Sequence, residues 1–506
     1  MRGAISRMPD EIYDLVVIGG GINGTGIAAD ASARGLSVLL AEAEDLAGAT
    51  SSASSKLIHG GLRYLEHFEL RLVREALAER EVLLAKAPHI IWPMRFILPH
   101  IAGMRPRALL RAGLFLYDHL ASRKTLDRSR ALDLRRDPAG APLASDLQHG
   151  FSYWDCWVDD ARLVVLNAIA AREAGALIVT RTPVRELSVD GGLWVVRLGT
   201  EERRVRARAI VNAAGPWVGD VARLVSGPRR ASPPTVRLVK GSHIVVPRIT
   251  GADDGYTFQH RDGRVVFALP FEENFTLIGT TERPQFGSPR AARVEKEEET
   301  YLLDIASRYF RAPLMPDQIV WSFVGVRPLD DDGSESASAV SRDYRLELEA
   351  GITPPILHVI GGKITTYRKL AEAALKLLEP HLVPMRQGTT ATTPLPGGDL
   401  DGRTFDTWFD DFARRNHGFN KGYLRRLARR YGTRSSRIIA EATTERDLGE
   451  NFGVGLSARE IAYLKAEEWA QTADDILWRR TKAGLHLAPD ERQRAEDAIG
   501  AYLGKV

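Results

Sequence analysis

Cysteine is nearly absent from this chain of 506 residues, with Cys156 as its one example. One cysteine cannot form a disulfide within the chain, so the sequence favours a reducing compartment. Long hydrophobic runs are also missing, because no uninterrupted apolar stretch reaches the ~18 residues that a membrane-spanning helix needs. Residues 1–10 contain no apolar core of a signal peptide, which argues against export by that route.

A strong net charge and metal-ligand motifs are lacking as well. The formal net charge is +4, which is too small to indicate nucleic-acid binding without local clustering. The 12 histidines are scattered, and no His-Glu-x-x-His motif or pair of carboxylates at ligand spacing occurs, so we expect no metal site. The length is too great for a single core and predicts two or three domains.

The stretch from Tyr13 to Glu42 has the pattern of a dinucleotide-binding βαβ unit. A short apolar run predicts a buried strand, which leads into a glycine-rich turn and then a helix. The turn consists of Gly19, Gly20, Gly21, Ile22, Asn23 and Gly24. Glycines allow a tight turn, a close approach of the backbone to a pyrophosphate, and packing of the helix on the sheet. Glu42 follows Gly24 by 18 residues, where an acidic side chain accepts hydrogen bonds from a ribose.

The remaining sequence predicts an α/β protein whose parallel-sheet, Rossmann-like domain is interrupted by a second sheet. Alternating strand and helix patterns assign residues 1–235 and 321–383 to the dinucleotide-binding domain. Short β-rich runs between turn residues assign residues 236–320 to an antiparallel sheet that covers the cofactor and holds the substrate. Residues 384–398 are rich in Pro, Gly and Thr and predict a linker, and residues 399–506 predict a helical C-terminal domain.

Several longer motifs carry a family resemblance. They include SSASSKLIHGGLRYLEH at 51–67, CWVDDARLV at 156–164, NAAGPW at 212–217, KGSHIVVPR at 240–248, GVRPL at 325–329 and GGKITTYRKLAE at 361–372. Together they resemble FAD-dependent glycerol-3-phosphate dehydrogenases of the bacterial aerobic respiratory type, within a wider group of flavoproteins similar to D-amino acid oxidase. The resemblance implies oxidation of sn-glycerol 3-phosphate to dihydroxyacetone phosphate, with FAD accepting the hydride.

The resemblance also implies a set of FAD-binding residues. The small hydroxyl and glycine residues that follow Glu42 suit a loop around the pyrophosphate and the polar edge of a ring. A second glycine turn, at 361–366, would aim a helix N-terminus at the flavin. Besides the first turn and Glu42, the implied residues are Thr50, Ser51, Ser54, Leu57, His59, Val184, Ala213, Gly215, Trp217, Gly325, Gly362 and Thr365.

The implied substrate site is basic, because a phosphate dianion calls for guanidinium forks. Matching the family motifs gives Arg63, Tyr64, Arg327, Arg342 and Lys363 as substrate-binding residues. Arg327 and Lys363 are counted as catalytic together with His243. His243 is the candidate base because imidazole titrates nearest to neutral pH. A buried histidine bonded to backbone is the alternative interpretation of His243, and Lys363 with a lowered pKa is the second candidate base.

The resemblance implies that electrons pass to a membrane quinone, which places the enzyme in the cytoplasm, peripherally on the inner face of the cytoplasmic membrane. Residues 99–124 mix arginines with leucine and phenylalanine, which suits either a helix among lipid headgroups or a core helix with a charged outer face. Residues 412–440 contain nine basic residues and no acid, which suits a solvated helix or one facing an anionic partner. A homodimer is also left open.

Two other functions share these motifs. A glycerol-3-phosphate oxidase that reduces O2 would have the same site with a different electron acceptor, although relatives of that kind often carry an extra segment that this sequence lacks. A D-amino acid oxidase-like flavoenzyme would need one arginine for a substrate carboxylate, whereas the motifs here supply three.

Overall fold

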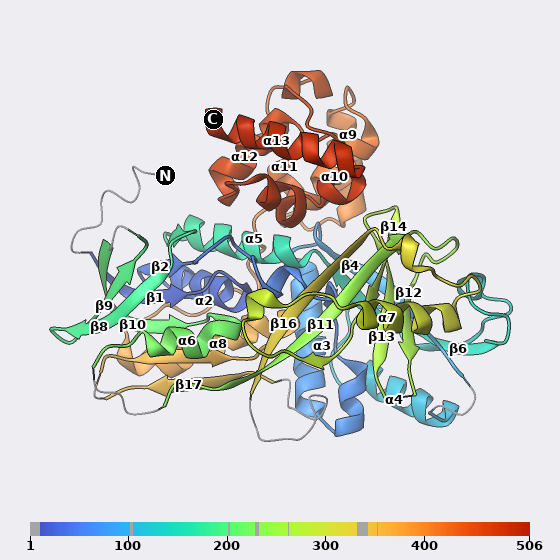
Figure 1. The fold of residues 1–506 in the computed structure, drawn as a ribbon, viewed down its shortest axis with the longest axis horizontal. Coiled ribbons are helices and arrows are strands. Elements are labelled where there is room, and N and C mark those ends of the chain that lie inside the picture. Colours follow the sequence, from blue (N-terminus) through green and yellow to red (C-terminus); the bar gives the residue numbers. More distant parts are fainter. Residues whose placement is uncertain are drawn as a thin grey trace.

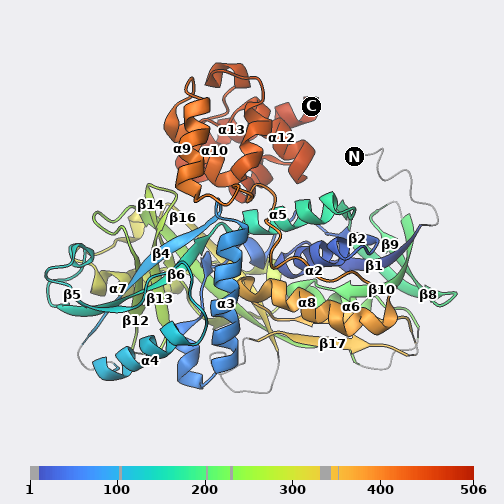
Figure 2. The same ribbon diagram turned by 180° about the vertical axis from the view of Figure 1, so that it is seen from behind.

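The computed structural model describes residues 11–101, 105–200, 203–227, 232–261, 263–330, 343–351 and 353–506. Figure 1 shows two lobes side by side, each built on a sheet, with a helical domain above them. The view from behind, in Figure 2, shows α3 (Leu70–Lys86) standing between the two lobes. This arrangement confirms the predicted α/β fold class with its two sheets and its helical C-terminal domain.

The first lobe contains a sheet of eight strands within the described residues. Its parallel strands are, in spatial order, β18 (Ile356–Ile360), β10 (Arg203–Asn212), β1 (Ile12–Ile18), β2 (Val38–Ala41) and β7 (Leu177–Val179). The antiparallel members are β17 (Arg345–Glu349), β8 (Val184–Asp190) and β9 (Leu193–Leu198). The central strands are almost continuously apolar because helices cover the sheet.

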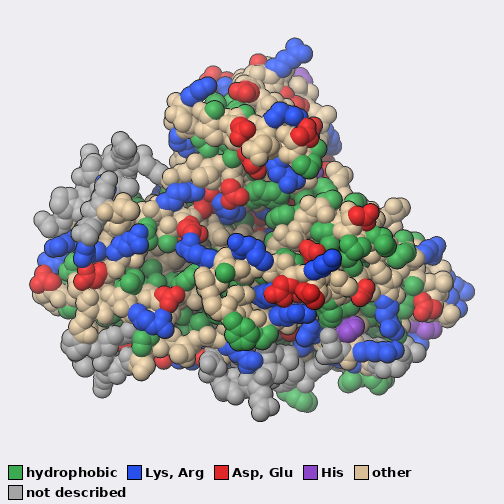
Figure 3. All heavy atoms as spheres, in the orientation of Figure 1, with side chains coloured by type: hydrophobic (Ala, Val, Ile, Leu, Met, Phe, Trp, Pro, Cys, Tyr) green, Lys and Arg blue, Asp and Glu red, His purple; other side chains and the backbone are tan. Residues whose placement is uncertain are grey.

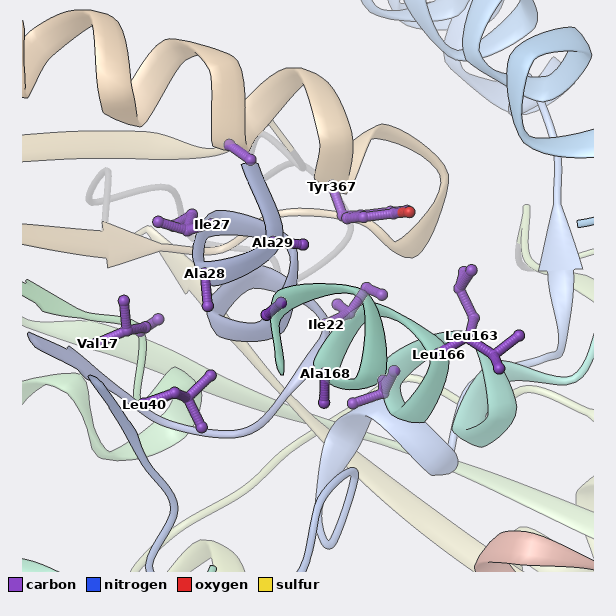
Figure 4. Close-up of a cluster of buried hydrophobic side chains, with 14 of the residues drawn as sticks. Val17, Ile22, Ile27, Ala28, Ala29, Leu40, Leu163, Leu166, Ala168 and Tyr367 are labelled. Carbon is purple, nitrogen blue, oxygen red and sulfur yellow. The ribbon is translucent and has the colours of Figure 1, made fainter. Parts of the chain in front are cut away.

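Figure 4 shows how the first helix packs against this sheet. Ile27 and Ala28 of α2 (Ile22–Ala33) lie in one buried cluster with Val17 and Leu40 of the sheet. The same cluster contains side chains of α5 (Asp160–Glu173) and of α8 (Tyr367–Leu378). Burial of this cluster fixes the N-terminal end of α2 at the carboxyl end of β1, where the glycine turn lies.

The second lobe contains a larger, mostly antiparallel sheet. Its strands are, in spatial order, β15 (Arg283–Pro284), β11 (Val236–Pro247), β14 (Phe275–Gly279), β13 (Val265–Phe271), β12 (Gly255–Gln259), β4 (Ile91–Pro99), β6 (His149–Val158) and β3 (Leu57–Ile58). In addition, β16 (Trp321–Asp330) pairs along β11, and β5 (Arg130–Asp133) pairs with β6. The sheet is therefore wider than the predicted segment 236–320, because earlier residues and β16 join it. The predicted domain boundaries stay predictions.

Two helices cover the second sheet on different sides. Leu302 and Ile305 of α7 (Lys296–Tyr309) share a buried cluster with β11 and β12. Leu110 and Leu114 of α4 (Arg107–His119) belong to another buried cluster, which they share with residues of β4 and β6. One side of the helix predicted within residues 99–124 is thus buried in the core, and the opposite side is exposed.

The C-terminal domain consists of α9 (Phe405–Arg415), α10 (Lys421–Tyr431), α11 (Ser435–Ile439), α12 (Ala458–Glu468), a π-helical turn (Asp475–Arg480) and α13 (Pro489–Lys505). The basic residues of α10 have partners within the chain. Arg430 donates to Glu460, Arg425 pairs with Asp406, and Arg429 lies over the ring of Phe405. These three basic side chains therefore have partners within the C-terminal domain. Among the described residues, none of the helices combines the length and apolar character needed to cross a bilayer.

Candidate functional site

The first glycine turn lies between the end of β1 and the start of α2, as predicted. A side chain at Gly24 would collide with the carbonyl oxygen of Gly19, because its Cβ would lie 1.9 Å from that atom. Gly19 also has a φ of 113°, which favours glycine. The Ile22 N–H donates to Ser51 Oγ (3.0 Å), so the loop after Glu42 folds back onto the turn. These features give a helix N-terminus that a pyrophosphate can approach closely.

Glu42 lies at the end of β2, directly beside the turn. Its carboxylate accepts hydrogen bonds from the N–H groups of Gly20 (2.6 Å) and Glu44 (2.7 Å). Burial raises the pKa of Glu42 to about 7, although the Gly20 N–H opposes the shift. A partly buried acid with its backbone donors already in place is suited to accept further hydrogen bonds from ribose hydroxyls. The turn and Glu42 together fit the adenosine diphosphate part of FAD.

A cavity of about 1,090 Å³ opens next to this turn. It brings together segments from both lobes: the loop at 50–65, strand β16 and the second glycine turn. The predicted cofactor residues that line it are Ile22, Thr50, Ser51, Ser54, Leu57, His59, Gly325, Gly362 and Thr365. The predicted substrate residues that line it are Arg63, Tyr64, Arg327 and Lys363.

Two of the predicted arginines meet at one point of this cavity. Arg63 Nη1 lies 3.6 Å from one oxygen of Glu282, and Arg327 Nη1 lies 3.4 Å from the other. Arg63 follows the glycine pair at 60–61, whereas Arg327 comes from β16, so two segments far apart in the sequence supply one guanidinium each. The Glu282 side chain is only 8% exposed. Its carboxylate offsets the repulsion between the two cations.

Lys363 lies at the second glycine turn, before α8. Its ammonium is 3.7 Å from the centre of the Tyr64 ring, a cation–π contact that holds both side chains at the cavity wall. The two glycine turns are joined, because Asn23 Nδ2 donates to the carbonyl oxygen of Gly361 (3.0 Å). The first and last parallel strands of the sheet therefore deliver their turns to the same place.

The two histidines of the predicted site differ in position. His243 is buried, its Nε2 lies 2.9 Å from Ser55 Oγ, and its ring stacks on Phe323. It does not line the cavity; Ser55 does. Burial, with Arg327 and Lys56 nearby, holds the pKa of His243 well below its ordinary value. His59 does line the cavity, and burial is the largest cause that lowers its pKa, followed in the same direction by Lys363 and Arg327.

The other predicted cofactor residues lie outside the cavity lining. Ala213 donates its N–H to the Ile18 carbonyl (2.9 Å) at the end of β1, and Gly215 and Trp217 form the turn that follows β10. Val184 begins β8. Arg342, the third predicted arginine, lies outside the described residues, so its place in the substrate site stays a prediction.

An ion pair that the motif comparison missed supports the cavity wall. Lys56 and Asp160 are both buried, and their Nζ and Oδ1 atoms lie 2.7 Å apart. Asp160 also accepts hydrogen bonds from the hydroxyl (2.7 Å) and the N–H (3.1 Å) of Ser54. Asp160 therefore fixes the loop that carries Ser54 and Ser55 to the first turn of α5. In the sequence, Asp160 lies in the run CWVDDARLV at 156–164, and Glu282 ends the run LIGTTE at 277–282.

Comparison with known proteins matches this architecture along nearly the whole chain. Residues 14–368 match the family model described as FAD dependent oxidoreductase, and residues 388–505 match the C-terminal domain of alpha-glycerophosphate oxidase. A glycerol-3-phosphate dehydrogenase of Pseudomonas aeruginosa is 52% identical over 498 residues, covering 97% of this chain and 95% of the relative. The chain belongs to the glycerol-3-phosphate dehydrogenase family of FAD-dependent oxidoreductases.

Members of this family differ in the substrates for which they are named. The D-erythritol 1-phosphate dehydrogenase of Brucella abortus is 49% identical over 487 residues, covering 95% of this chain and 96% of the relative. Among solved structures, the glycerol-3-phosphate dehydrogenase of Bacillus halodurans complexed with FAD is similar with a TM-score of 0.75 and 25% identity, covering 99% of this chain and 96% of that one. The cofactor of this dehydrogenase family member is FAD, in agreement with the glycine turn, Glu42 and the adjoining cavity.

Proposed function

We propose that this flavoprotein oxidises sn-glycerol 3-phosphate to dihydroxyacetone phosphate. The observation that carries the proposal is the pair Arg63 and Arg327, which face the same carboxylate from two distant segments of the chain at the cavity wall. Guanidinium forks are well suited to a phosphate ester, because each can donate two parallel hydrogen bonds to it. A hydrophobic or neutral substrate would gain nothing from these charges.

The phosphate would be held by the arginines, with Lys363 and Tyr64 contacting the hydroxyl oxygens of the substrate. FAD supplies the acceptor for the hydride that leaves the central carbon. The chain must supply a base for the hydroxyl proton, at a position that reaches the cavity. His59 meets this requirement better than His243, because His59 lines the cavity whereas His243 lies behind Ser55.

His243 would then act from behind the wall, by holding Ser55 in place. The two histidines can be separated by the same substitution at each position. His59→Asn should lower kcat by about 10²–10⁴-fold, the usual contribution of a positioned base, and kcat should recover partly as pH rises. His243→Asn should keep the pH dependence of kcat that the unchanged enzyme shows. If His243→Asn changes this pH dependence and His59→Asn does not, the base is His243.

The substrate itself is tested by comparing phosphorylated and unphosphorylated polyols. Reduction of an artificial dye should have the highest kcat/KM with sn-glycerol 3-phosphate, a lower value with D-erythritol 1-phosphate, and almost none with glycerol. A preference for the four-carbon phosphate would shift the proposal to the activity for which the Brucella relative is named. Equal rates with glycerol would show that the phosphate is not recognised.

We also propose a membrane quinone as the electron acceptor and a peripheral position on the inner face of the cytoplasmic membrane. The support lies at the mouth of the cavity, where Leu109 and Phe68 line the cavity and are largely exposed to solvent. Phe115, which lies on α4 together with Leu109, is 57% exposed. Arg105 and Arg111 lie nearby in the sequence. Exposed apolar side chains beside arginines suit the headgroup layer of a bilayer.

This membrane proposal makes a direct test available. Leu109→Asp combined with Phe115→Asp should reduce co-sedimentation with anionic vesicles and reduce quinone reduction, while dye reduction stays unchanged. Unchanged vesicle binding would contradict the assignment of α4 as the contact. On the face drawn in Figure 3, the basic and acidic side chains of the described residues are interspersed.

A further inference from the structure

The segment at 42–48 connects the two parts of the dinucleotide site. It begins at Glu42, beside the ribose position, and leads to the loop whose Ser51 bonds the start of α2. Within this segment, Leu46 packs directly beneath the glycine turn, since a Cβ at Gly20 would lie 2.9 Å from Leu46 Cδ2. The Ala47 N–H also donates to the Gly20 carbonyl (3.1 Å). Any shift of the segment would therefore move the turn that receives the pyrophosphate.

The C-terminal domain holds this segment through a buried ion pair. Both guanidinium Nη atoms of Arg480 donate to the two oxygens of Asp45, each at 2.8 Å. Arg480 is 0% exposed and Asp45 is 3% exposed. The opposite side of Arg480 is fixed as well, because its Nε and Nη2 donate to the carbonyl oxygen of Glu468. Arg479 adds a third contact, with its Nε 2.6 Å from Asp45 Oδ2.

We propose that the Arg480–Asp45 pair is a positioning contact for FAD, through which docking of the C-terminal domain controls how fast the cofactor is released. A carboxylate this deeply buried is stable only with its cationic partner, and it will move toward water when the fork that satisfies both its oxygens is removed. Such a movement displaces Leu46 and Glu42 together. The site then loses both the acid that faces the ribose, Glu42, and the side chain that packs beneath the glycine turn, Leu46.

Another interdomain contact provides a matched control. Arg434 of the C-terminal domain pairs with Glu173 and Glu467. Glu173 is the last residue of α5, at the opposite end from Asp160, which holds the cofactor loop. Removing Arg434 therefore weakens docking of the same two domains without touching the segment at 42–48. If general loosening of the domain were enough to release FAD, the two arginines would be equivalent.

The test follows FAD leaving the diluted holoenzyme by the rise in free-flavin fluorescence. Arg480→Gln should release FAD about tenfold faster than the unchanged enzyme or more, since tenfold corresponds to only about 1.4 kcal/mol. Arg480→Lys should fall between them, because it keeps the charge and loses the fork. Arg434→Gln should release FAD at the unchanged rate. Circular dichroism and gel filtration establish that each variant is folded.

Two results overturn the proposal: a folded Arg480→Gln variant that releases FAD within twofold of the unchanged enzyme, or an Arg434→Gln variant that releases it as fast as Arg480→Gln. If Arg480→Gln fails to fold, Arg479→Gln decides by the same comparison, because it leaves the Arg480 fork in place and should accelerate release severalfold. The inference depends on FAD as cofactor and not on the substrate, so its failure leaves the proposed oxidation of glycerol 3-phosphate untouched.

Discussion

Replacement of Arg327 gives the sharpest view of how the substrate is held. Its backbone is fixed, because β16 pairs with β11 along its length and Arg327 lies opposite Val239. Its side chain is 27% exposed and reaches the cavity, where it pairs with Glu282. Arg327→Met therefore removes the guanidinium from the proposed substrate site, while we expect the sheet, the glycine turn and the bound FAD to stay in place.

The magnitude follows from the bonds that the fork can make to a phosphate. Each charge-assisted hydrogen bond contributes about 1.5–3 kcal/mol, so two contribute about 3–6 kcal/mol. At about 1.4 kcal/mol for each factor of ten, Arg327→Met should lower kcat/KM for glycerol 3-phosphate by about 10²–10⁴-fold. Arg327→Lys keeps one of the two bonds and should lose about 10–100-fold.

Steady-state dye reduction, with the flavin content of each preparation measured from its absorbance, checks this expectation. Arg345→Met is the matched control. Arg345 pairs with Asp330, the last residue of the strand that carries Arg327, and Arg345 does not line the cavity. Glycerol is the second control, since a substrate without phosphate should be oxidised equally slowly by the Arg327→Met variant and by the unchanged enzyme. A kcat/KM for glycerol 3-phosphate within threefold of the unchanged value would refute the assignment.

Two further predictions concern the acidic residues Asp160 and Glu42. Asp160→Asn leaves Lys56 buried without its counter-charge, so it should cost about 3–5 kcal/mol of stability, measured by urea unfolding; unaltered unfolding would contradict the role of this pair. Burial raises the pKa of Glu42 from 4.5 to about 7, so Glu42 favours folding below pH 4.5 and that contribution is lost as pH rises through 7. The apoprotein should therefore lose up to about 3 kcal/mol more stability between pH 4.5 and 8 than its Glu42→Gln variant; identical pH profiles would contradict it.

Local features were predictable from the sequence because neighbouring residues determine them. The strand, glycine turn and helix at the N-terminus follow one another along the chain, and Glu42 was found by its spacing from Gly24. The helical C-terminal domain followed from its periodicity in the same way. Arg63, Arg327 and Lys363 were recognised from motifs, and the structure brings all three to one cavity.

Features that depend on contacts between distant segments were not predictable. β12 pairs with β4, about 160 residues earlier in the chain, so the width of the second sheet could not be read from residues 236–320. The burial of His243 depends on packing against Phe323 and Gly279, which its own motif does not reveal. The partner of Arg430 lies on another element, α12, so the sequence of residues 412–440 did not reveal it.

The most direct test of the account is to add sn-glycerol 3-phosphate to the oxidised holoenzyme without oxygen and to follow the yellow flavin absorbance. We predict that the absorbance bleaches with one equivalent of glycerol 3-phosphate per flavin and persists when glycerol is added instead, because Arg63 and Arg327 recognise the phosphate. Absorbance that is unchanged by glycerol 3-phosphate, or bleached equally by glycerol, would contradict the central claim.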